Sequence, residues 1–173
     1  MEKYIPVIYQ KSIYTIDYSK LLSNGITCLL YDLDNTIISL DSKEMPEKAK
    51  DLFISLKQKG FKVILFSNSP KSKVDIYKKY LNVDGIHLAL KPYSIKFKKL
   101  IKNYRLKVDE IAIIGDQIMT DVVGGNKIGI TTILVNPITT NEHIFSKINR
   151  ILERRKIKKL EAKNLFRKGK YYD

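Results

Sequence analysis

Five short apolar stretches recur along the chain, and segments of a different periodicity separate them. They lie at residues 26–32, 62–66, 85–90, 110–114 and 131–135. Each stretch is too short for a typical helix, and most are rich in Ile, Val or Leu. That composition is typical of strands that are buried on both faces of a parallel sheet. The pattern therefore predicts a mainly parallel five-stranded sheet.

Helical spacing fills the intervals between these stretches. Pro46 can begin a helix and Gly60 can end it, and apolar residues recur every three or four positions between them. Similar spacing predicts helices around residues 74–80, 95–101 and 121–128. Strands that alternate with helices predict a layered α/β domain with right-handed crossovers.

The C-terminal part of the chain has a different composition. Ile144, Ile148, Ile151 and Leu152 keep helical spacing, so we expect a helix there that packs on the domain through these residues. Residues 147–170 hold eleven Lys or Arg and two Glu, which accounts for most of the chain's formal net charge of +14. A chain this basic attracts an anionic partner such as nucleic acid, an acidic membrane surface or a phosphorylated substrate.

The remaining composition narrows the class of protein. A chain of 173 residues with 44% hydrophobic residues fits one globular domain. The single cysteine, Cys28, cannot form an internal disulfide. No apolar run approaches the ~20 residues needed to cross a bilayer, and the first ten residues lack a secretory signal pattern. We expect a cytoplasmic protein that could bind peripherally at the inner face of the membrane.

Polar residues suited to phosphoryl chemistry follow four of the five predicted strands. In chain order they are Asp32 and Asp34, Ser67 and Asn68, Lys91, and Asp116 with Asp121. The carboxyl ends of parallel strands meet at one edge of a sheet, so these side chains are predicted to form one site. Transfer through an aspartyl phosphate needs a nucleophilic carboxylate, a second acid–base group, hard oxygen ligands for Mg²⁺ and donors for the transferring oxygens.

These residues carry a resemblance to a known family. Asp32-Leu33-Asp34-Asn35-Thr36 resembles DxDxT, the first motif of the haloacid dehalogenase (HAD) superfamily, and Ser67, Lys91 and Gly115-Asp116 with Asp121 resemble the other three motifs in order. Six further segments, at residues 13–17, 25–26, 90–92, 115–117, 120–126 and 149–155, resemble the YqeG family. Its members are small phosphatases of HAD subclass IIIA, similar to phosphatidylglycerophosphate phosphatases. The resemblance extends from about residue 5 to the basic C-terminus.

The resemblance implies a role for each catalytic residue. Asp32 would be the nucleophile and a metal ligand. Asp34 would be the general acid–base and would offer its backbone carbonyl to the metal. Ser67 and the backbone amide of Asn68 would bind the phosphate, and Lys91 would offset the charge on the nucleophile and the phosphate.

The resemblance also implies Mg²⁺ as the cofactor and a HAD-like Rossmannoid three-layer sandwich as the fold. Asp116 would bind the metal directly. Asp121 would hold the shell around the metal, through water in one reading, although its position also suits the N-cap of the helix that follows.

The spacing of the motifs leaves no room for a cap domain. Only 30 residues separate Thr36 from Ser67, and 22 separate Asn68 from Lys91, so one helix and one strand use most of each interval. The open site that results would accept a phosphate carried by a lipid head group, a protein or the end of a nucleic acid. We expect an N-terminal extension at residues 1–24, a phosphatase core at 25–145 and a basic helix or tail at 146–173.

The sequence thus predicts a Mg²⁺-dependent phosphomonoester hydrolase that acts through an aspartyl phosphate and converts phosphatidylglycerophosphate to phosphatidylglycerol. The basic C-terminus would then bind an anionic membrane surface. One alternative is a HAD phosphatase that acts on a soluble or protein-borne phosphomonoester. Another is a basic RNA- or ribosome-associated binding protein, although the sparse aromatic residues of the tail offer no evident surface for stacking bases.

Overall fold

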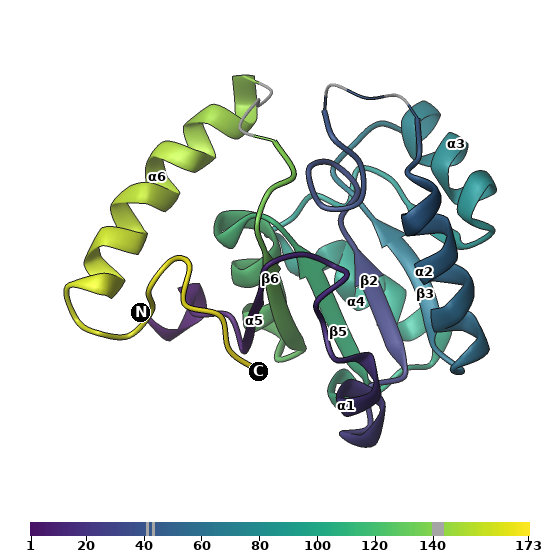
Figure 1. Cartoon of the computed structure of the whole chain (residues 1–173), viewed down its shortest axis with the longest axis horizontal. Helices are drawn as coiled ribbons and strands as arrows, with labels where there is room; N and C mark the ends of the chain where they lie inside the picture. Colours follow the sequence, from purple (N-terminus) through teal and green to yellow (C-terminus); the bar gives the residue numbers. More distant parts are fainter. Residues whose placement is uncertain (41, 43, 140–143) are drawn as a thin grey trace.

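The strands form a parallel sheet with helices on both faces (Figure 1). The computed structural model describes residues 1–40, 42, 44–139 and 144–173, with residues 144–149 described by their backbone alone. In this part of the chain the sheet has six strands in the order β1-β6-β5-β2-β3-β4. They are β1 (Ile8–Gln10), β2 (Cys28–Tyr31), β3 (Lys62–Phe66), β4 (Asp84–Ile86), β5 (Ile111–Gly115) and β6 (Thr131–Val135).

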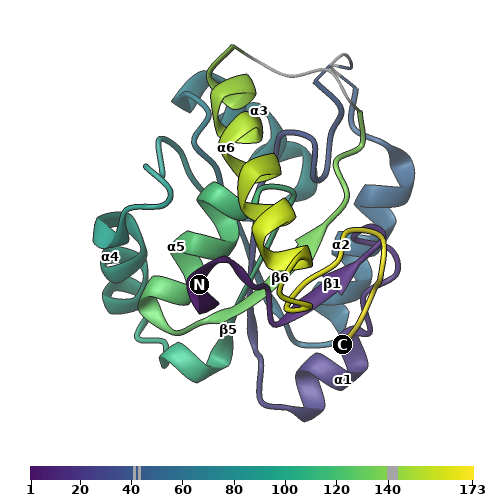
Figure 2. The ribbon, with the colours of Figure 1, turned by 90° about the vertical axis from the view of Figure 1, so that its left-hand side faces the viewer.

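The helices cover the sheet as two outer layers. They are α1 (Tyr18–Ser23), α2 (Glu47–Gln58), α3 (Lys71–Leu81), α4 (Ser94–Tyr104), α5 (Val123–Ile128) and α6 (Ile144–Glu161). Helices α1, α2 and α3 share a buried core with one face of the sheet, and α4 shares another with the opposite face. Figure 2 shows α4 and α5 on one side of the sheet and α1 and α2 on the other. The predicted three-layer α/β class is confirmed.

Strand β2 lies at the centre of the sheet and shows why the sequences of the strands are continuous apolar runs. All four of its residues are buried. Leu29 and Tyr31 pack toward α2, whereas Cys28 and Leu30 pack toward α4. A strand buried on both faces needs apolar residues at every position, and full burial of one Leu contributes about 1.5–3 kcal/mol.

The sheet has one more strand than the five predicted. Strand β1 has only three residues, of which only Tyr9 is buried, and Pro6 interrupts the apolar residues 4–9 that lead into it, so the sequence pattern did not predict it. It joins the sheet by parallel pairing with β6, and the C-terminal Tyr172 pairs with Tyr9 on its other side. The N-terminal segment therefore contributes directly to the sheet, and the domain boundaries at residues 24 and 145 stay predictions.

Two predicted elements begin or end elsewhere. The strand expected at residues 85–90 ends at Ile86, because Leu88 and Leu90 have φ angles of +45° and +56° that no strand accommodates. The helix expected at residues 121–128 is preceded by a short π-helical turn, η3 (Ile118–Val122). π-Helical turns are rare and occur often at functional sites.

Helix α6 does not pack on the domain through Ile151 and Leu152, two of the four residues predicted to do so. Ile151 and Leu152 are 52% and 41% exposed, and the side chains of Ile144 and Ile148 lie outside the described residues. The buried side chains are those of Arg150, Glu153, Ile157 and Leu160. Arg150 donates to the backbone oxygen of Asp116, and Glu153 accepts from the Ile118 N–H. These hydrogen bonds set the rotation of the helix, so its apolar spacing did not predict the buried face.

The basic segment after α6 folds back onto the edge of the sheet. Phe166 is buried, and its ring centroid lies 5.3 Å from that of Tyr9. Tyr172 exchanges two backbone hydrogen bonds of 2.9 Å with Tyr9. The tail thereby covers the outer edge of β1, which would otherwise expose unpaired backbone groups.

No cap domain interrupts the described part of the chain. The interval from β2 to β3 holds α2, and the interval from β3 to β4 holds α3. None of the described helices is long and apolar enough to cross a membrane.

Candidate active site

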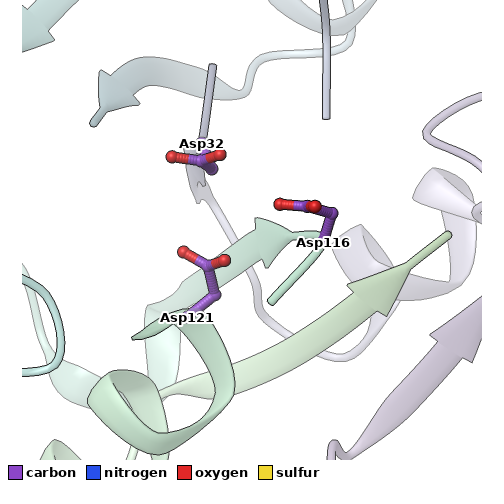
Figure 3. Close-up of side chains that lie close together, drawn as sticks. All are labelled: Asp32, Asp116 and Asp121. Atoms are coloured by element: carbon purple, nitrogen blue, oxygen red, sulfur yellow. The ribbon is translucent and has the colours of Figure 1, made fainter. Parts of the chain in front are cut away.

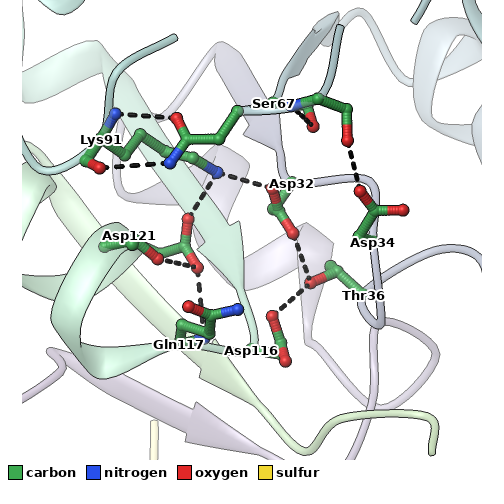
Figure 4. Close-up of polar contacts among 11 residues, drawn as sticks. Asp32, Asp34, Thr36, Ser67, Lys91, Asp116, Gln117 and Asp121 are labelled. Atoms are coloured by element: carbon green, nitrogen blue, oxygen red, sulfur yellow. Dashed lines mark hydrogen bonds and ion pairs between the residues drawn. The ribbon is translucent and has the colours of Figure 1, made fainter. Parts of the chain in front are cut away.

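The side chains predicted to form a site meet at the carboxyl edge of the sheet (Figure 4). Asp32 directly follows β2, Ser67 follows β3 and Asp116 follows β5. Lys91 lies in the segment that connects β4 to α4, and Asp121 lies in η3. Residues that are far apart in the sequence are thereby brought into one polar cluster, as the parallel sheet predicts.

Asp32, Asp116 and Asp121 form a buried cluster of carboxylates (Figure 3). One oxygen of each lies within 4.8 Å of the corresponding oxygens of the other two. Asp121 approaches closely because Gly115 has no side chain, and a Cβ atom there would overlap the Asp121 carboxylate. The backbone N–H of Gln117 donates to Asp121 over 3.2 Å and holds it in this orientation.

Lys91 is a buried cation in contact with two members of this cluster. Its Nζ donates to Asp32 Oδ1 over 2.6 Å and to Asp121 Oδ1 over 2.7 Å, and its side chain is 1% exposed. The Asn68 side chain holds the Lys91 backbone, because Asn68 Oδ1 accepts from Lys91 N over 2.8 Å and Asn68 Nδ2 donates to Lys91 O over 3.1 Å. Sequence reasoning assigned only the backbone amide of Asn68 and missed this use of its side chain.

Burial changes the protonation of these groups. Burial raises the pKa of Asp32 to about 7, with the neighbouring Asp121 adding to the effect and Lys91 opposing it. Burial also raises the pKa of Asp116 well above its ordinary value, although the positive charge of Arg150 opposes it. For Lys91 burial lowers the pKa, but the carboxylates of Asp121 and Asp32 outweigh it and the pKa is raised. Lys91 is therefore positively charged at neutral pH.

Asp34 lies apart from the three clustered carboxylates. Its Oδ1 forms an ion pair with Lys73, and its Oδ2 accepts a hydrogen bond from the Ser69 hydroxyl. The Asp34 side chain is 22% exposed, so this carboxylate sits nearer to solvent than Asp32 does. Sequence reasoning missed both partners, and the only signal was their position just after Ser67 and Asn68 and at the start of a helix.

Two hydroxyl groups complete the floor of the site. Ser67 is buried, and its Oγ accepts a hydrogen bond of 3.1 Å from the Ser69 N–H. Thr36 Oγ1 lies 3.4 Å from Asp32 Oδ2 and 3.5 Å from Asp116 Oδ1, so this hydroxyl stands between the two carboxylates.

Arg150 connects helix α6 to the site. Its NH2 forms an ion pair with Asp116 Oδ2, and its NH1 donates to the backbone oxygen of Asp116 over 2.9 Å. The same NH1 donates to Glu153 Oε1 over 3.0 Å, and Glu153 Oε2 accepts from the Ile118 N–H over 3.1 Å. Although Arg150 belongs to the basic C-terminal segment, the structure buries it against a carboxylate of the cluster.

The donor set fits a divalent cation. In the described part of the site, four buried carboxylates, those of the aspartate cluster and Glu153, face two buried cations, Lys91 and Arg150. When all six groups are ionised, two negative charges remain in excess. The three clustered carboxylates offer only oxygen ligands, which are those that Mg²⁺ prefers. The cluster therefore matches a hard divalent ion in both charge and ligand type.

We expect the apparent affinity for Mg²⁺ to fall as the pH is lowered below about 7. The pKa of Asp32 is about 7, so below that pH the cation must displace a proton from this carboxylate. Each displaced proton weakens the apparent affinity by about tenfold per pH unit. Calorimetric titrations in buffers of different ionisation enthalpy would measure both the affinity and the protons released. An affinity that does not change between about pH 5.5 and about pH 7.5 would contradict this coupling.

Comparisons with known proteins agree with this geometry. A family model described as HAD-hydrolase-like matches residues 89–148. The chain is 32% identical over 160 residues to the probable phosphatase YqeG of Bacillus subtilis (strain 168), covering 92% of this chain and 93% of that protein. It is 24% identical to phosphatidylglycerophosphate phosphatase 1, chloroplastic/mitochondrial, of Arabidopsis thaliana. That match covers 82% of this chain but 43% of the plant protein, so the chain spans less than half of that relative.

A solved structure shares the fold. The predicted HAD-like family hydrolase from Porphyromonas gingivalis matches with a TM-score of 0.54 over 74% of this chain and 98% of that one. The two sequences are 13% identical, so this likeness concerns the fold alone.

Proposed function

The chain belongs to the YqeG family of HAD-type phosphatases, and from this premise we propose that it hydrolyses phosphomonoesters with Mg²⁺ through a phosphorylated Asp32. The observation that carries the proposal is the setting of the Asp32 carboxylate. It is buried at the carboxyl end of the central strand, bonded to Lys91 and clustered with Asp116 and Asp121. Family membership favours this enzyme over the RNA-associated binding protein considered from the sequence.

Asp32 begins the reaction. One of its carboxylate oxygens attacks the phosphorus in line with the ester oxygen, so that an Asp32–phosphate bond forms as the phosphorus–ester bond breaks. The bonding electrons leave on the ester oxygen, which takes a proton from Asp34 in its protonated form, so the ion pair of Asp34 with Lys73 must open before this step. Water then attacks the phosphorus of the acyl phosphate while Asp34 accepts its proton, which releases inorganic phosphate and restores Asp32.

The other residues hold the charges of this reaction. Lys91 offsets negative charge on Asp32 and on the transferring phosphate. The Ser67 Oγ accepts from the Ser69 N–H, which leaves the Ser67 hydroxyl proton for a phosphate oxygen beside the backbone amide of Asn68.

Mg²⁺ bound by the aspartate cluster would neutralise charge on both nucleophile and phosphate. Asp32 and Asp116 are its proposed direct ligands, together with the backbone carbonyl of Asp34. Asp121 already accepts hydrogen bonds from Lys91, Gln117 and Thr120, which supports a place around the metal rather than on it.

Replacing Asp34 with Asn should slow an alkyl phosphate by about 10²–10⁴-fold, because its leaving oxygen needs a proton. The loss of acid catalysis should slow phosphorylation by p-nitrophenyl phosphate much less, since that leaving group is stable without a proton. Initial rates for both esters, with single-turnover release of p-nitrophenol, would measure the difference. Asp75→Asn is the matched control, because Asp75 pairs with Lys71 and Lys78 on the surface of α3. Equal losses of p-nitrophenol release and alkyl ester cleavage would exclude Asp34 as the acid.

The proposed substrate is phosphatidylglycerophosphate, whose terminal phosphate is a monoester. Three features support a lipid-borne phosphate. The described chain has no cap domain that would enclose a small metabolite, the net charge is +14, and a plant relative is named for this lipid. The exposed basic side chains of α6 and the tail would add attraction to an anionic membrane face, about 1 kcal/mol for each Lys or Arg near the surface.

The test is phosphate release with Mg²⁺ from phosphatidylglycerophosphate in mixed micelles, beside a panel of soluble phosphomonoesters. The Asp32→Asn protein provides the blank. Turnover of the lipid well above that of the soluble compounds is the expected result. Turnover of soluble or protein-borne esters alone would keep the mechanism and discard the lipid, and turnover of neither would discard the proposed activity.

A further inference from the structure

Four bulky apolar side chains stand exposed in one short segment beside the candidate site. Leu88, Leu90, Tyr93 and Ile95 are 48%, 50%, 65% and 68% exposed, and all lie where the chain passes from β4 into α4. Ile138, which is 49% exposed, follows β6 at the same edge of the sheet. We call these five residues the apolar rim. Single exposed apolar residues are ordinary, but several at one edge of a soluble protein mark a surface that binds a partner.

Hydrogen bonds fix the rim next to the catalytic groups. The Leu88 N–H donates over 3.0 Å to the backbone oxygen of Ser69, the residue whose hydroxyl holds Asp34. The Ile138 N–H donates over 3.0 Å to the backbone oxygen of Asn35, in the loop that follows Asp32. The rim therefore borders the site from two sides, at the loop after β3 that carries Ser67 and at the loop after β2 that carries Asp32 and Asp34.

The backbone of the rim turns two leucines toward solvent. Leu88 and Leu90 have φ angles of +45° and +56°, a left-handed conformation that is uncommon for any residue except Gly, Asn and Asp. Between them Ala89 is fully buried, and its N–H donates to the Ser67 oxygen over 2.9 Å. Such strain persists where the surrounding structure imposes it, and it concentrates at ligand-binding segments. Here it places buried Ala89 and Lys91 inward and both leucines outward.

The charge around the rim favours an anionic lipid surface. From residue 92 to residue 108 the chain has five Lys and one Arg and no Asp or Glu, whereas Lys91 just before them is buried in the site. Lys98 and Lys99 stand exposed on α4, which follows the rim directly; Figure 2 shows α4 at the left margin of the molecule. Apolar side chains flanked by lysines suit the boundary between head groups and acyl chains, where the lysines meet lipid phosphates.

The C-terminal segment exposes apolar side chains of its own. Ile157, Leu160 and Phe166 are buried against Tyr9 and the outer edge of the sheet. Ile151, Leu152, Leu165 and Tyr171 are 52%, 41%, 46% and 41% exposed, so this basic segment is the rival docking surface. The rim differs from it because four of its five side chains lie within residues 88–95 and its backbone is hydrogen-bonded to the loops after β2 and β3.

We propose that the apolar rim inserts into an anionic phospholipid surface and docks the mouth of the active site on it. This proposal rests on one part of the proposed function, namely that the substrate phosphate is carried by a lipid. A docked rim would hold the loops after β2 and β3 at the level of the lipid phosphates, so a head group could reach Asp32 without leaving the membrane.

The test uses the full chain with Leu88→Asn and Leu90→Asn together. Asn accepts a positive φ better than Leu does, so the fold should be kept while both apolar side chains are removed. Ile54→Gln is the matched control, because Ile54 is 42% exposed on α2, away from the rim. A third variant, Lys158→Glu with Lys159→Glu, changes exposed charges of α6 alone. Flotation with vesicles of phosphatidylglycerol and phosphatidylcholine measures binding, and hydrolysis of p-nitrophenyl phosphate reports the intact site.

We expect the rim variant to bind the anionic vesicles roughly tenfold or more weakly than the parent chain, with unchanged hydrolysis of the soluble ester. The Ile54 control should bind like the parent. Binding that survives in the rim variant, or that only the Lys158 and Lys159 changes abolish, would overturn the proposal. A parent chain that binds no vesicles would also overturn the proposal, and so would one that uses the rim to form a dimer instead.

Failure of the lipid substrate gives a different result from failure of docking. Rim-dependent vesicle binding together with turnover of soluble esters alone would keep the docking surface and discard the lipid substrate. Turnover of phosphatidylglycerophosphate in micelles with rim-independent vesicle binding would keep the substrate and discard the docking surface.

Discussion

Replacing Asp32 with Asn is expected to lower phosphate release by at least about 10⁴-fold, because an amide cannot attack phosphorus as the carboxylate does. The fold should persist. Asn has nearly the same shape as Asp. The substitution also removes a buried carboxyl group, and burial raises the pKa of this group to about 7. Phosphate assays and thermal unfolding of the same preparations would measure both effects.

The covalent intermediate gives this prediction a second readout. Brief incubation with radiolabelled substrate followed by acid quenching should leave an acid-stable, base-labile phosphate on the parent chain and none on the Asp32→Asn variant. Asp51→Asn is a suitable control, since Asp51 is exposed on α2. Normal turnover in the Asp32 variant would exclude the aspartyl phosphate mechanism altogether.

Replacing Arg150 with Met is expected to destabilise the metal-free protein by about 3–5 kcal/mol, the usual cost of leaving buried charges without their partner. Asp116 and Glu153 are both buried and both bind this guanidinium. Without it their negative charges lie together beside α6, and the helix should separate from η3. Urea unfolding of the variant and the parent would measure the loss.

Mg²⁺ should recover part of this stability, because a cation bound near Asp116 replaces some of the missing positive charge and binds only the folded chain. Arg154→Met is the matched control. Arg154 is exposed one turn further along α6, and its loss should change the unfolding free energy by no more than about 0.5 kcal/mol. A loss below about 1 kcal/mol for Arg150→Met would show that the buried ion pairs contribute little.

Much of the core could be predicted from local pattern. Strands β3 and β6 occupy the same residues in the prediction and in the structure. Both strands are buried at nearly every position. Because a strand buried on both faces needs consecutive apolar residues, the sequence shows it as an apolar run. Strand β1 has one buried residue and depends on β6 and Tyr172 for its pairing, and Pro6 interrupts the apolar residues that lead into it, so its pattern did not predict a strand.

The candidate site divides in the same way. Asp32, Lys91 and Asp116 could be predicted to meet because parallel strands deliver the loops at their carboxyl ends to one edge. The pairing of Asp34 with Lys73 joins residues 39 positions apart, and that of Arg150 with Asp116 joins residues 34 apart. No local periodicity encodes which surface cation turns inward to a distant carboxylate.

The sequence by itself determined the layered α/β fold, the order of the motifs and the reaction class of the family, because burial and motif spacing are properties of short segments. Only the tertiary structure decided the rotation of α6, the covering of β1 by the tail and the exposure of Leu88 and Leu90 beside the site. Each of these depends on hydrogen bonds between segments distant in the chain, and such bonds can outweigh the local preference of a helix or a leucine.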